Sequence, residues 1–447
     1  MSKKVVIIGG DAAGMSAASQ IKRQKKDWHV KVFEKGKYVS YAACGMPYYI
    51  QGAVSHFESL IEIKPETFIN DRGIDLKLNS EVIKILPDEN IVQVNIDGKI
   101  FEEDYDYLVI ATGASPNMGD FPINSNKVFT INNLYDTKKI EKFIKNNSPN
   151  SVAVIGGGFI AIEMVEAFHS KGLETHLIHR RDSLSKIFEK EVSDAILSEM
   201  KSKDITLHLN EKIKMIKDNN GKVQVITEQN ILSFDFVLLA IGVVPNTQFL
   251  LDSGINLGIK KSVSVNEYLL TNYENIFSAG DCTETFSIIT GEKVYTPLAL
   301  KANREGMLAG LNISGKKEKF PGVCETAITK IFDIGIARSG ITLDRALKNN
   351  FNAVKFDLIS KTKARYYPGA EKIKSFIILD KDSGTVLGAQ LVGPIYAVKR
   401  IDVWATIISN KMTIKEVFNL DLAYSPPFSP VWDPVLLAAR VGRRYVK

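Results

Sequence analysis

Two internal repeats and a change of texture near residue 323 predict an α/β fold in which two βαβ-containing domains precede an α+β domain. In the first repeat, a β-branched run, a glycine turn and an amphipathic stretch occur twice, as KKVVIIGGDAAGMSAASQIKRQ and as NSVAVIGGGFIAIEMVEAFHSK. Each copy returns to a short alternating run, HVKVFE (29–34) or ETHLIH (174–179). A strand, a glycine turn, a helix and a second strand are typical of a dinucleotide-binding unit. We therefore expect two Rossmann-like domains.

The second repeat closes each βαβ unit. YDYLVIATGASPN (105–117) matches FDFVLLAIGVVPN (234–246), and both indicate a buried parallel strand that leaves at a Gly-containing turn. IFSAGDC (276–282) indicates one more buried strand. After residue 323, strands with an Asp-Ser-Gly turn precede helical patterns at 397–409 and 413–419. The predicted domains are 1–118 with 246–322, then 119–245, then 323–447.

Length and composition agree with this organisation and exclude several classes of protein. The 447 residues correspond to about three domains at ~150 residues each. The formal net charge of +6 comes from scattered basic residues, which favours small anionic ligands over nucleic acid. No run approaches the ~18 apolar residues of a membrane helix, and the N-terminal apolar run is too short for a signal peptide. We expect neither nucleic acid nor membrane as a partner.

The cysteines are sparse and widely spaced. Cys44, Cys282 and Cys324 form no CxxC pair and no zinc pattern, so we expect no metal site. An odd, sparse set fits a reducing cytoplasm better than a disulfide scaffold, and the cytoplasm is the expected location.

The first glycine turn predicts a nucleotide site. Gly9, Gly10 and Gly14 follow a strand and open a helix, where free N–H groups and the helix dipole favour a pyrophosphate. Glu34 ends the next strand, and a carboxylate there accepts hydrogen bonds from a ribose diol. Asp11 replaces the second glycine of the pattern. This acid is unfavourable near a pyrophosphate unless it points away, for example as an N-cap. A βαβ unit without nucleotide is the alternative.

The second glycine turn predicts a different ligand. His179, Arg180 and Arg181 stand where the first unit has its acid, and guanidinium groups suit a 2′-phosphate. We therefore expect FAD in the first unit and NADPH, with NADH possible, in the second. The alternative is a solvated basic turn. The predicted cofactor contacts are Gly9, Gly10, Ala12, Ala13, Gly14, Glu34, Ala111, Thr112, Gly113, Gly280, Asp281, Gly156, Gly158, Phe159, Ile160, Glu163, His179, Arg180, Arg181 and Gly242.

Asp281 and Phe159 are each expected to contact a particular portion of a cofactor. Asp281 follows the strand that ends at Gly280, so it is expected to hydrogen-bond the ribityl or phosphate arm of the flavin. A plain turn aspartate is the alternative. Phe159 directly follows the second glycine turn, and its ring is a candidate gate for the nicotinamide pocket.

Cys44 is the candidate redox residue. It lies in SYAACGMPYY, ten residues after Glu34, and Pro47 suits the first turn of a helix. We expect Cys44 at a helix N-terminus, where the dipole lowers the pKa of a thiol and favours the thiolate. The alternative is a buried, inert cysteine.

This constellation resembles the pyridine nucleotide–disulfide oxidoreductase superfamily over nearly the whole chain. Members similar to glutathione reductase carry a second cysteine five residues after the first, where this chain has Tyr49. The chain is therefore similar to the single-cysteine branch, which contains coenzyme A disulfide reductase, NADH peroxidase and NADH oxidase. The peroxidases and oxidases carry a histidine where this chain has Ala12, which counts against both activities.

Two C-terminal motifs, RYYPG (365–369) and AYSPPFSPVWDP (423–434), resemble the tyrosine motifs of coenzyme A disulfide reductase. The resemblance implies a homodimer in which Tyr366 and Tyr424 of the partner subunit act as acids or orienters at the cysteine, with Tyr367 as a neighbouring candidate. It also implies a coenzyme A channel, for which an ordinary solvated helix face is the alternative. The implied substrate contacts are Ser16, Gln20, Arg23, Ser40, Ala43, Arg72 and Trp432. Ala43 departs from the asparagine of some relatives.

The resemblance implies FAD-dependent reduction of coenzyme A disulfide by NADPH through Cys44. Three alternatives stay open: an NAD(P)H oxidase that uses oxygen, a reductase of coenzyme A persulfide or polysulfide, and a flavin-binding redox sensor without turnover.

Overall fold

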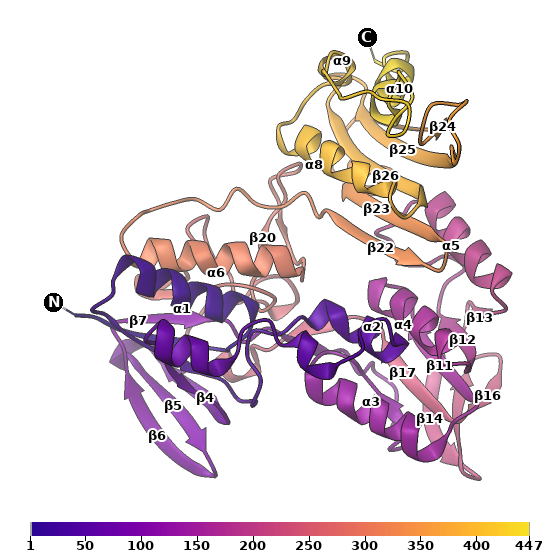
Figure 1. Cartoon of the computed structure of the whole chain (residues 1–447). Helices are drawn as coiled ribbons and strands as arrows, with labels where there is room; N and C mark the ends of the chain where they lie inside the picture. The colour runs from indigo at the N-terminus through magenta and orange to yellow at the C-terminus, as the bar shows by residue number, and fades with distance from the viewer. Residues whose placement is uncertain (1, 447) are drawn as a thin grey trace.

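The structure is a computed structural model that describes residues 2–446, and it has three parts, each built on a five-stranded sheet (Figure 1). The first sheet is parallel and has the strand order β19-β7-β1-β2-β3. Its strand β1 is buried at four of five positions, as expected for a parallel sheet covered on both faces. The elements of this part are β1 (Lys4–Ile8), α1 (Ala12–Gln24), β2 (His29–Phe33), β3 (Asp75–Lys77), β7 (Tyr107–Ile110), β19 (Ile276–Ser278), β20 (Thr285–Phe286), β21 (Lys293–Val294) and α6 (Ala299–Ile313).

Helices α1 and α6 lie side by side over this sheet (Figure 1). Glycine permits the close approach, because a Cβ at Gly306 would lie 2.1 Å from the Ala13 carbonyl oxygen. An antiparallel sheet of β4 (Ser80–Leu86), β5 (Ile91–Ile96) and β6 (Lys99–Asp104) is attached to the same part. The chain between β2 and β3 carries the short helix α2 (Met46–Gln51), which packs against α3 (Leu134–Asn147) and α4 (Phe159–Ser170) of the second part.

The second part repeats the architecture of the first. Its parallel sheet has the order β10-β17-β11-β12-β13, and a smaller sheet has the order β16-β15-β14-β9. The side chain of Asn133 caps α3 by accepting from the Tyr135 and Asp136 N–H groups. The elements are β9 (Ile123–Asn124), β10 (Val128–Phe129), α3 (Leu134–Asn147), β11 (Ser151–Gly156), α4 (Phe159–Ser170), β12 (Glu174–His179), α5 (Lys190–Ser202), β13 (Thr206–Leu209), β14 (Ile213–Asn219), β15 (Lys222–Thr227), β16 (Ile231–Phe234) and β17 (Phe236–Ala240).

The two matching segments found in the sequence meet where the chain crosses between these parts. Strand β8 (Ala114–Pro116) pairs antiparallel with β18 (Val243–Pro245). The contact is reinforced by Asn246, whose backbone oxygen accepts from Thr112 Oγ1 at 2.8 Å and whose Nδ2 donates to the Thr112 carbonyl at 2.8 Å. The repeat thus forms a paired crossover between the two nucleotide-type units.

The third part is an antiparallel sheet with the order β22-β23-β26-β25-β24, covered by helices. Trp404 on α8 is 1% exposed and anchors that helix in the core. The elements are β22 (Ala327–Ile331), β23 (Ile334–Gly340), α7 (Leu343–Lys348), β24 (Ala353–Lys361), β25 (Lys372–Asp380), β26 (Val386–Pro394), α8 (Ile401–Ser409), α9 (Ile414–Phe418) and α10 (Pro434–Gly442). The predicted fold class, two Rossmann-like parts and an α+β part, is confirmed.

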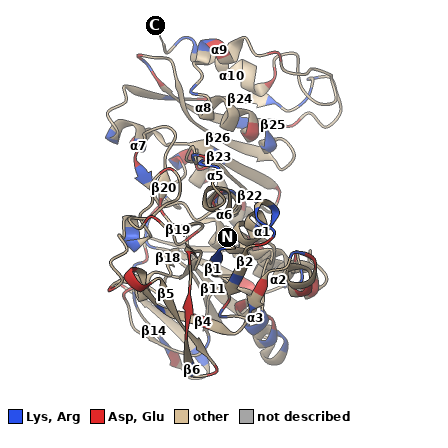
Figure 2. Cartoon of the chain, turned by 90° about the vertical axis from the view of Figure 1, so that its left-hand side faces the viewer, with Lys and Arg blue, Asp and Glu red and all other residues tan. Residues whose placement is uncertain are grey.

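Charged side chains of both signs are interspersed over the face shown in Figure 2. Within residues 2–446, no helix combines the length and the apolar character needed to cross a bilayer.

Candidate active site

Cys44 is the exposed thiol of the described chain. It lies in the 3-10 turn Ala43–Gly45, directly before α2, while Cys282 and Cys324 are buried. The Cys282 sulfur lies 3.4 Å from the carbonyl oxygens of both Ile110 and Ala279, so it is already engaged inside the first part. Cys44 is therefore the thiol that a substrate can reach.

The expected low pKa of Cys44 is wrong for the chain by itself. Although the side chain reaches the surface, desolvation by the surrounding protein is the largest cause that raises its pKa. The carboxylates of Glu163, Asp281 and Asp11 raise it further. The helix dipole is too weak to compensate, because α2 has only six residues and Cys44 precedes its N-cap, Gly45. The cysteine thus faces negative charge from three different elements.

A polar cluster from the second and third parts faces Cys44. Glu163 on α4 accepts a hydrogen bond from Thr329 Oγ1 at 2.8 Å, and burial raises its pKa. Tyr48 joins this cluster, because burial and then Glu163 raise its pKa to about 12 while a hydrogen bond with Thr329 opposes the shift. The sequence predicted Glu163 as a cofactor contact and gave no role to Tyr48 or Thr329. The spacing of Tyr48, four residues after Cys44 in a helical segment, was the available signal.

The first glycine turn is pressed against both neighbouring strands. Gly9 has a φ of +106°, and a Cβ there would lie 2.1 Å from the Ala111 carbonyl oxygen. Glu34 is fixed by two backbone donors, since Oε2 accepts from the Gly10 N–H at 2.8 Å and Oε1 from the Gly36 N–H at 2.7 Å. Each carboxylate oxygen keeps a further lone pair, which suits a ribose diol.

Asp11 occupies the N-cap position of α1, but its side chain makes no cap hydrogen bond. The carboxyl turns instead to the loop before Cys44, where Oδ1 accepts from the Tyr41 N–H at 3.2 Å. The N-cap role that we considered for Asp11 is therefore wrong, and its orientation relative to a bound pyrophosphate stays a prediction.

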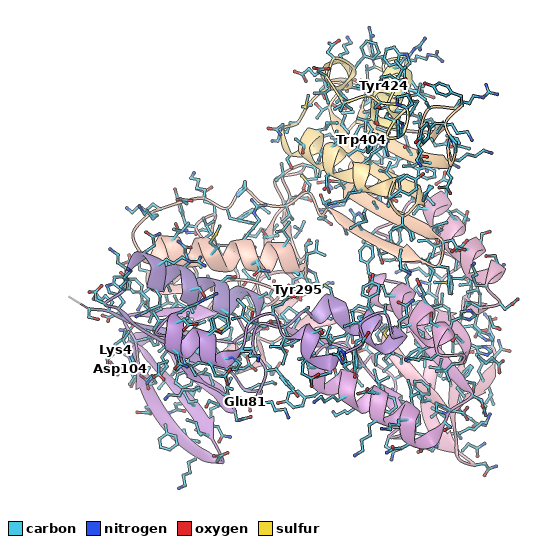
Figure 3. All side chains as sticks on the ribbon, viewed as in Figure 1. Lys4, Glu81, Asp104, Tyr295, Trp404 and Tyr424 are labelled. Atoms are coloured by element: carbon cyan, nitrogen blue, oxygen red, sulfur yellow. The ribbon has the colours of Figure 1, made fainter. Side chains whose placement is uncertain are left out.

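Asp281 leaves β19 on a rigid turn. The Gly280 N–H donates to Glu305 Oε2 at 2.9 Å, and Lys301 Nζ donates to the Gly280 carbonyl at 2.8 Å. Lys301 and Glu305 form a buried ion pair at 3.0 Å, one helical turn apart on α6. The Tyr295 hydroxyl, labelled in Figure 3, donates to the Asp281 carbonyl at 2.8 Å.

The Asp281 carboxyl itself is incompletely paired. Its Oδ1 is buried and has no hydrogen-bond partner among the described residues, and burial raises its pKa. A buried polar atom without a partner is expensive unless a ligand satisfies it. Glu34, the N-terminus of α1 and this oxygen together fit the ribose, diphosphate and polyol groups of a flavin dinucleotide.

The second glycine turn has the same geometry as the first. A Cβ at Gly156 would lie 2.2 Å from the Ala240 carbonyl oxygen, and a Cβ at Gly157 would lie 2.7 Å from the His179 ring. His179 thus occupies the place of Glu34. Burial, then Arg181 and Arg180, lower its pKa and favour the neutral ring.

Arg180 and Arg181 form no ion pair with any residue of 2–446, so both guanidinium groups remain available.

The Phe159 ring contacts Phe188 edge-on, with ring centroids 5.5 Å apart, at the start of α4. The remaining predicted contacts lie close to the two turns. Ala12 and Ala13 open α1, Gly14 follows them, Gly158 and Ile160 flank the start of α4, and Gly113 and Gly242 border the crossover at φ values of +67° and +112°.

The predicted substrate contacts on α1 are only partly presented to solvent. Arg23 is exposed and donates to Gln20 Oε1 at 3.3 Å, but Gln20 is 8% exposed and packs beside Gly310 of α6. Ser16 Oγ donates to Asn303 Oδ1 at 2.9 Å. The expected continuous face of Ser16, Gln20 and Arg23 is therefore interrupted at Gln20, which is inside the contact between α1 and α6.

The remaining predicted substrate residues flank this helix. Arg72 Nη1 donates to Ser19 Oγ at 2.7 Å, and its guanidinium lies 4.7 Å from the Phe68 ring centroid. Ser40 has a φ of +47° and donates its N–H to the Gly10 carbonyl at 3.1 Å. Ala43 directly precedes Cys44. Both Ser40 and Ala43 therefore lie between the end of β2 and Cys44, and Ser40 contacts the glycine turn.

The predicted tyrosines come together in the third part of the chain. A hydrogen bond with Tyr366 is the largest cause that raises the pKa of Tyr424. Tyr366 is 77% exposed, Tyr367 is 37% exposed, and Trp432 stacks on Phe418. Tyr424 lies at the top of Figure 3, far from α2 in the same view of Figure 1. One chain does not bring these tyrosines to its own Cys44.

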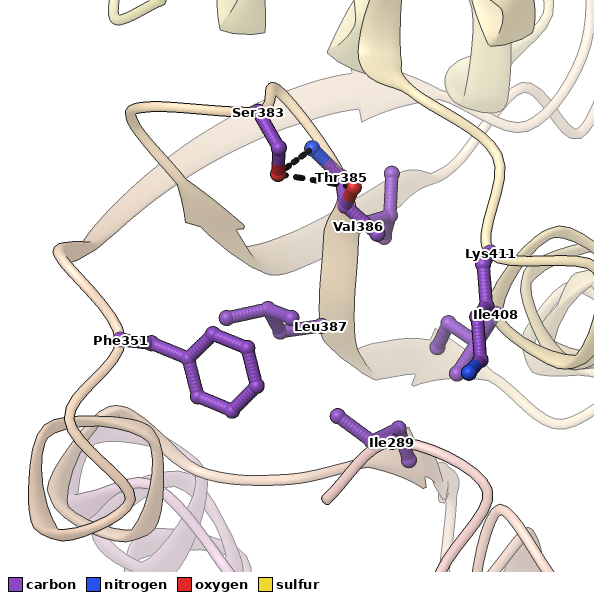
Figure 4. A pocket seen from close by; sticks show the side chains of 8 residues that line it. All are labelled: Ile289, Phe351, Ser383, Thr385, Val386, Leu387, Ile408 and Lys411. Atoms are coloured by element: carbon purple, nitrogen blue, oxygen red, sulfur yellow. Dashed lines mark hydrogen bonds between the residues drawn. The ribbon is translucent and has the colours of Figure 1, made fainter. Parts of the chain in front are cut away.

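A pocket of about 220 Å³ lies elsewhere, between the third part and the loop around Ile289 (Figure 4). Its walls are apolar apart from Ser383, Thr385 and Lys411, and it contains neither a thiol nor a carboxylate. It therefore has no group for redox or acid–base chemistry.

Known proteins match the whole organisation. The family described as pyridine nucleotide-disulphide oxidoreductase matches residues 3–306, and the dimerisation domain of that family matches residues 326–434. NAD(P)H coenzyme A polysulfide/persulfide reductase of Pyrococcus horikoshii is 41% identical over 443 residues, which cover 99% of this chain and 98% of the relative. Coenzyme A disulfide reductase of Staphylococcus haemolyticus is 32% identical and covers 97% and 98%. The structure of an NAD-dependent persulfide reductase from A. fulgidus superposes with a TM-score of 0.96 at 35% identity, covering 99% of this chain and 83% of the other.

Proposed function

Because the chain belongs to the pyridine nucleotide-disulphide oxidoreductase family, we propose that it reduces a sulfur–sulfur bond of a coenzyme A derivative with NADPH, through Cys44. The chain is an oxidoreductase whose cofactors are FAD and NAD(P)H. The observation that carries the proposal is Cys44, the exposed thiol, which has no second cysteine beside it. A lone thiol that attacks a disulfide stores the oxidised state as a mixed disulfide with the substrate.

Three groups of this chain would each hold a different portion of FAD. Glu34 would hold the ribose, the N–H groups at the start of α1 would hold the diphosphate, and the unpartnered Oδ1 of Asp281 would accept from a hydroxyl of the ribityl arm. When bound, FAD supplies two-electron transfer from the nicotinamide to sulfur.

The sulfur chemistry balances with Cys44 alone. The Cys44 thiolate attacks one sulfur of coenzyme A disulfide, a Cys44–coenzyme A disulfide forms, and one coenzyme A leaves as a thiolate that takes a proton. Two electrons from NADPH then cleave the mixed disulfide and release the second coenzyme A thiol. The sum is one NADPH and one proton consumed, with two thiols formed.

The raised pKa of Cys44 is compatible with this cycle. Reductive cleavage of the mixed disulfide delivers the sulfur as a thiolate, so no base must first remove a proton. Because nucleophilicity rises with pKa, the same acidic surroundings make the released thiolate a stronger nucleophile.

Acid groups for the leaving sulfur would come from a second subunit. Tyr366 and Tyr424 are both exposed, Tyr366 raises the pKa of Tyr424, and residues 326–434 match a dimerisation domain. A homodimer that brings this pair to the partner's Cys44 would supply phenol protons to the departing thiolate.

The acceptor distinguishes two candidate functions. Coenzyme A disulfide fits the mixed-disulfide cycle, and a persulfide of coenzyme A is favoured by the relative at 41% identity. Anaerobic NADPH oxidation by the purified protein with each acceptor decides between them. Faster turnover with the disulfide, and two thiols per NADPH, supports the disulfide reductase. Faster turnover with the persulfide, and release of hydrogen sulfide, supports the second candidate. Turnover only in air would reject both in favour of an oxidase.

Arg180 and Arg181 should decide the nicotinamide preference. Replacing both with alanine is expected to raise KM for NADPH by at least about tenfold and to leave KM for NADH nearly unchanged, since charge-assisted hydrogen bonds to the 2′-phosphate are lost. Steady-state kinetics with both nucleotides measures this. The exposed Lys186→Ala is the matched control. Equal changes for NADPH and NADH would show that the arginines do not bind the 2′-phosphate.

A further inference from the structure

The glycine turn at the start of α1 does not require the carboxyl group of Asp11. In the second unit the same position is Gly158, which is also the N-cap of its helix. The backbones match, with φ and ψ of −108° and −153° at Asp11 and −95° and −175° at Gly158. The first unit therefore carries an acid where its own internal copy makes the identical turn without a side chain.

The charges of two other carboxyl groups act on Asp11 at this end of α1. Glu34, at the end of β2, and Asp281, in the turn after β19, both raise the pKa of Asp11. The loop before α2 contributes the Tyr41 N–H and the side chains of Tyr41 and Cys44. On α6, Lys301 and Glu305 act on the Asp281 turn.

No cation compensates Asp11 directly. It is in no ion pair with any described residue, and its hydrogen-bond donor is the Tyr41 backbone. Burial is the largest cause that raises its pKa to about 7, and Glu34 and Asp281 raise it further against the Tyr41 hydrogen bond. The charge on Asp11 therefore changes within the physiological pH range.

We propose that FAD binds while Asp11 is a neutral carboxylic acid and is held more weakly once Asp11 ionises, so that retention of the flavin depends on pH. The inference rests on the proposed placement of FAD at the first glycine turn. The second glycine of this pattern is where backbone and pyrophosphate approach each other, so a side chain there lies beside the diphosphate. An ionised Asp11 would repel the two negative charges of the diphosphate, whereas a neutral Asp11 would not.

The sign of the effect follows from linkage. Below pH 7 Asp11 already carries its proton, and binding costs no proton uptake. Above pH 7 the free protein must take up one proton to bind FAD, so the dissociation constant rises with pH. For one group with a pKa of about 7, the rise between pH 6 and pH 8 is about tenfold.

The test measures the dissociation constant of FAD from the full-length holoprotein at pH 6, 7 and 8, by ultrafiltration and flavin fluorescence. We expect the rise of about tenfold in the wild type, and changes below about twofold in Asp11→Asn and in Asp11→Gly, which restores the residue of the second unit. Asp136→Asn is the matched control, because burial also raises the pKa of this carboxyl, which lies on α3 in the second part. It should keep the pH dependence.

Each other outcome overturns the inference. A wild type whose affinity for FAD is constant with pH removes Asp11 as a titrating contact. Asp11 variants that keep the rise, or an Asp136→Asn variant that loses it, assign the proton to another group. A wild type that binds no FAD at any pH would refute the proposed function as well, so the two failures can be told apart.

Discussion

The Cys44→Ser variant is expected to lose at least ~10³-fold of the NADPH-dependent turnover of a coenzyme A disulfide or persulfide, while it still binds FAD. A serine hydroxyl neither attacks a disulfide at neutral pH nor stores a mixed disulfide. Because the predicted FAD and NADPH contacts are untouched, rapid mixing with NADPH should still bleach the flavin absorbance in a single turnover. Separate rates for flavin reduction and for thiol release measure the two halves of the reaction.

The matched control for this variant is Cys324→Ser. Cys324 is buried in the third part and its sulfur lies 3.2 Å from Ser409 Oγ. The Cys324→Ser variant should keep wild-type turnover. Its content of bound FAD shows whether the variant has folded. Substantial disulfide reduction by the Cys44→Ser protein would move the redox chemistry away from that cysteine.

The Lys301→Met variant is expected to lower the free energy of unfolding by about 3–5 kcal/mol, the usual cost of removing one partner of a buried ion pair. The side chains of Lys301 and Glu305 are 2% and 0% exposed, so water cannot replace the lost ammonium group. The Gly280 carbonyl also loses a donor. The thermal midpoint, followed by release of FAD fluorescence, reports the loss.

The pH dependence of this loss separates charge from packing. Burial already raises the pKa of Glu305 to about 7, and removing Lys301 takes away the group that lowers it. The folded state is therefore penalised once pH rises above the ordinary carboxyl pKa, and the variant should lose more stability at pH 8 than at pH 6. The double variant Lys301→Met/Glu305→Met should recover much of the loss. A loss independent of pH that the double variant does not recover would indicate a packing defect.

Much of the fold could be predicted because it depends on local patterns. Buried parallel strands require continuous apolar runs, and tight turns against a neighbouring strand require glycine, as at Gly9 and Gly156. Both requirements produce recognisable patterns in a few consecutive residues. Because the same patterns occur twice in this chain, they predict the fold more strongly than a single copy would. The candidate redox role of Cys44 was likewise visible beside Pro47 and the first βαβ unit.

The electrostatics of the site could not be predicted in the same way. The pKa of Cys44 depends on Glu163 from α4 and Asp281 from the turn after β19, which are distant in sequence. The local motif alone suggested a helix dipole, whose effect is smaller than desolvation and three carboxylates. Lys301 and Glu305 escaped notice because a charged pair one helical turn apart usually indicates a solvated face, whereas α6 buries both.

The exposed tyrosines show a different limit. Their motifs indicated Tyr366 and Tyr424 only through resemblance, and Tyr424 lies far from α2, the helix that follows Cys44 (Figures 1 and 3). A residue that acts in a partner's site has no contact within its own chain from which its role follows. The 77% exposure of Tyr366 agrees with a role at an interface.

The central claim, that Cys44 carries the substrate covalently, is tested most directly by mass spectrometry. The protein is reduced anaerobically with NADPH, freed of nucleotide, treated with coenzyme A disulfide and quenched in acid without thiols. We predict one coenzyme A per chain, on the peptide that contains Cys44, and its loss after a second addition of NADPH. A chain that carries no adduct, or carries it on Cys282 or Cys324, would contradict the account.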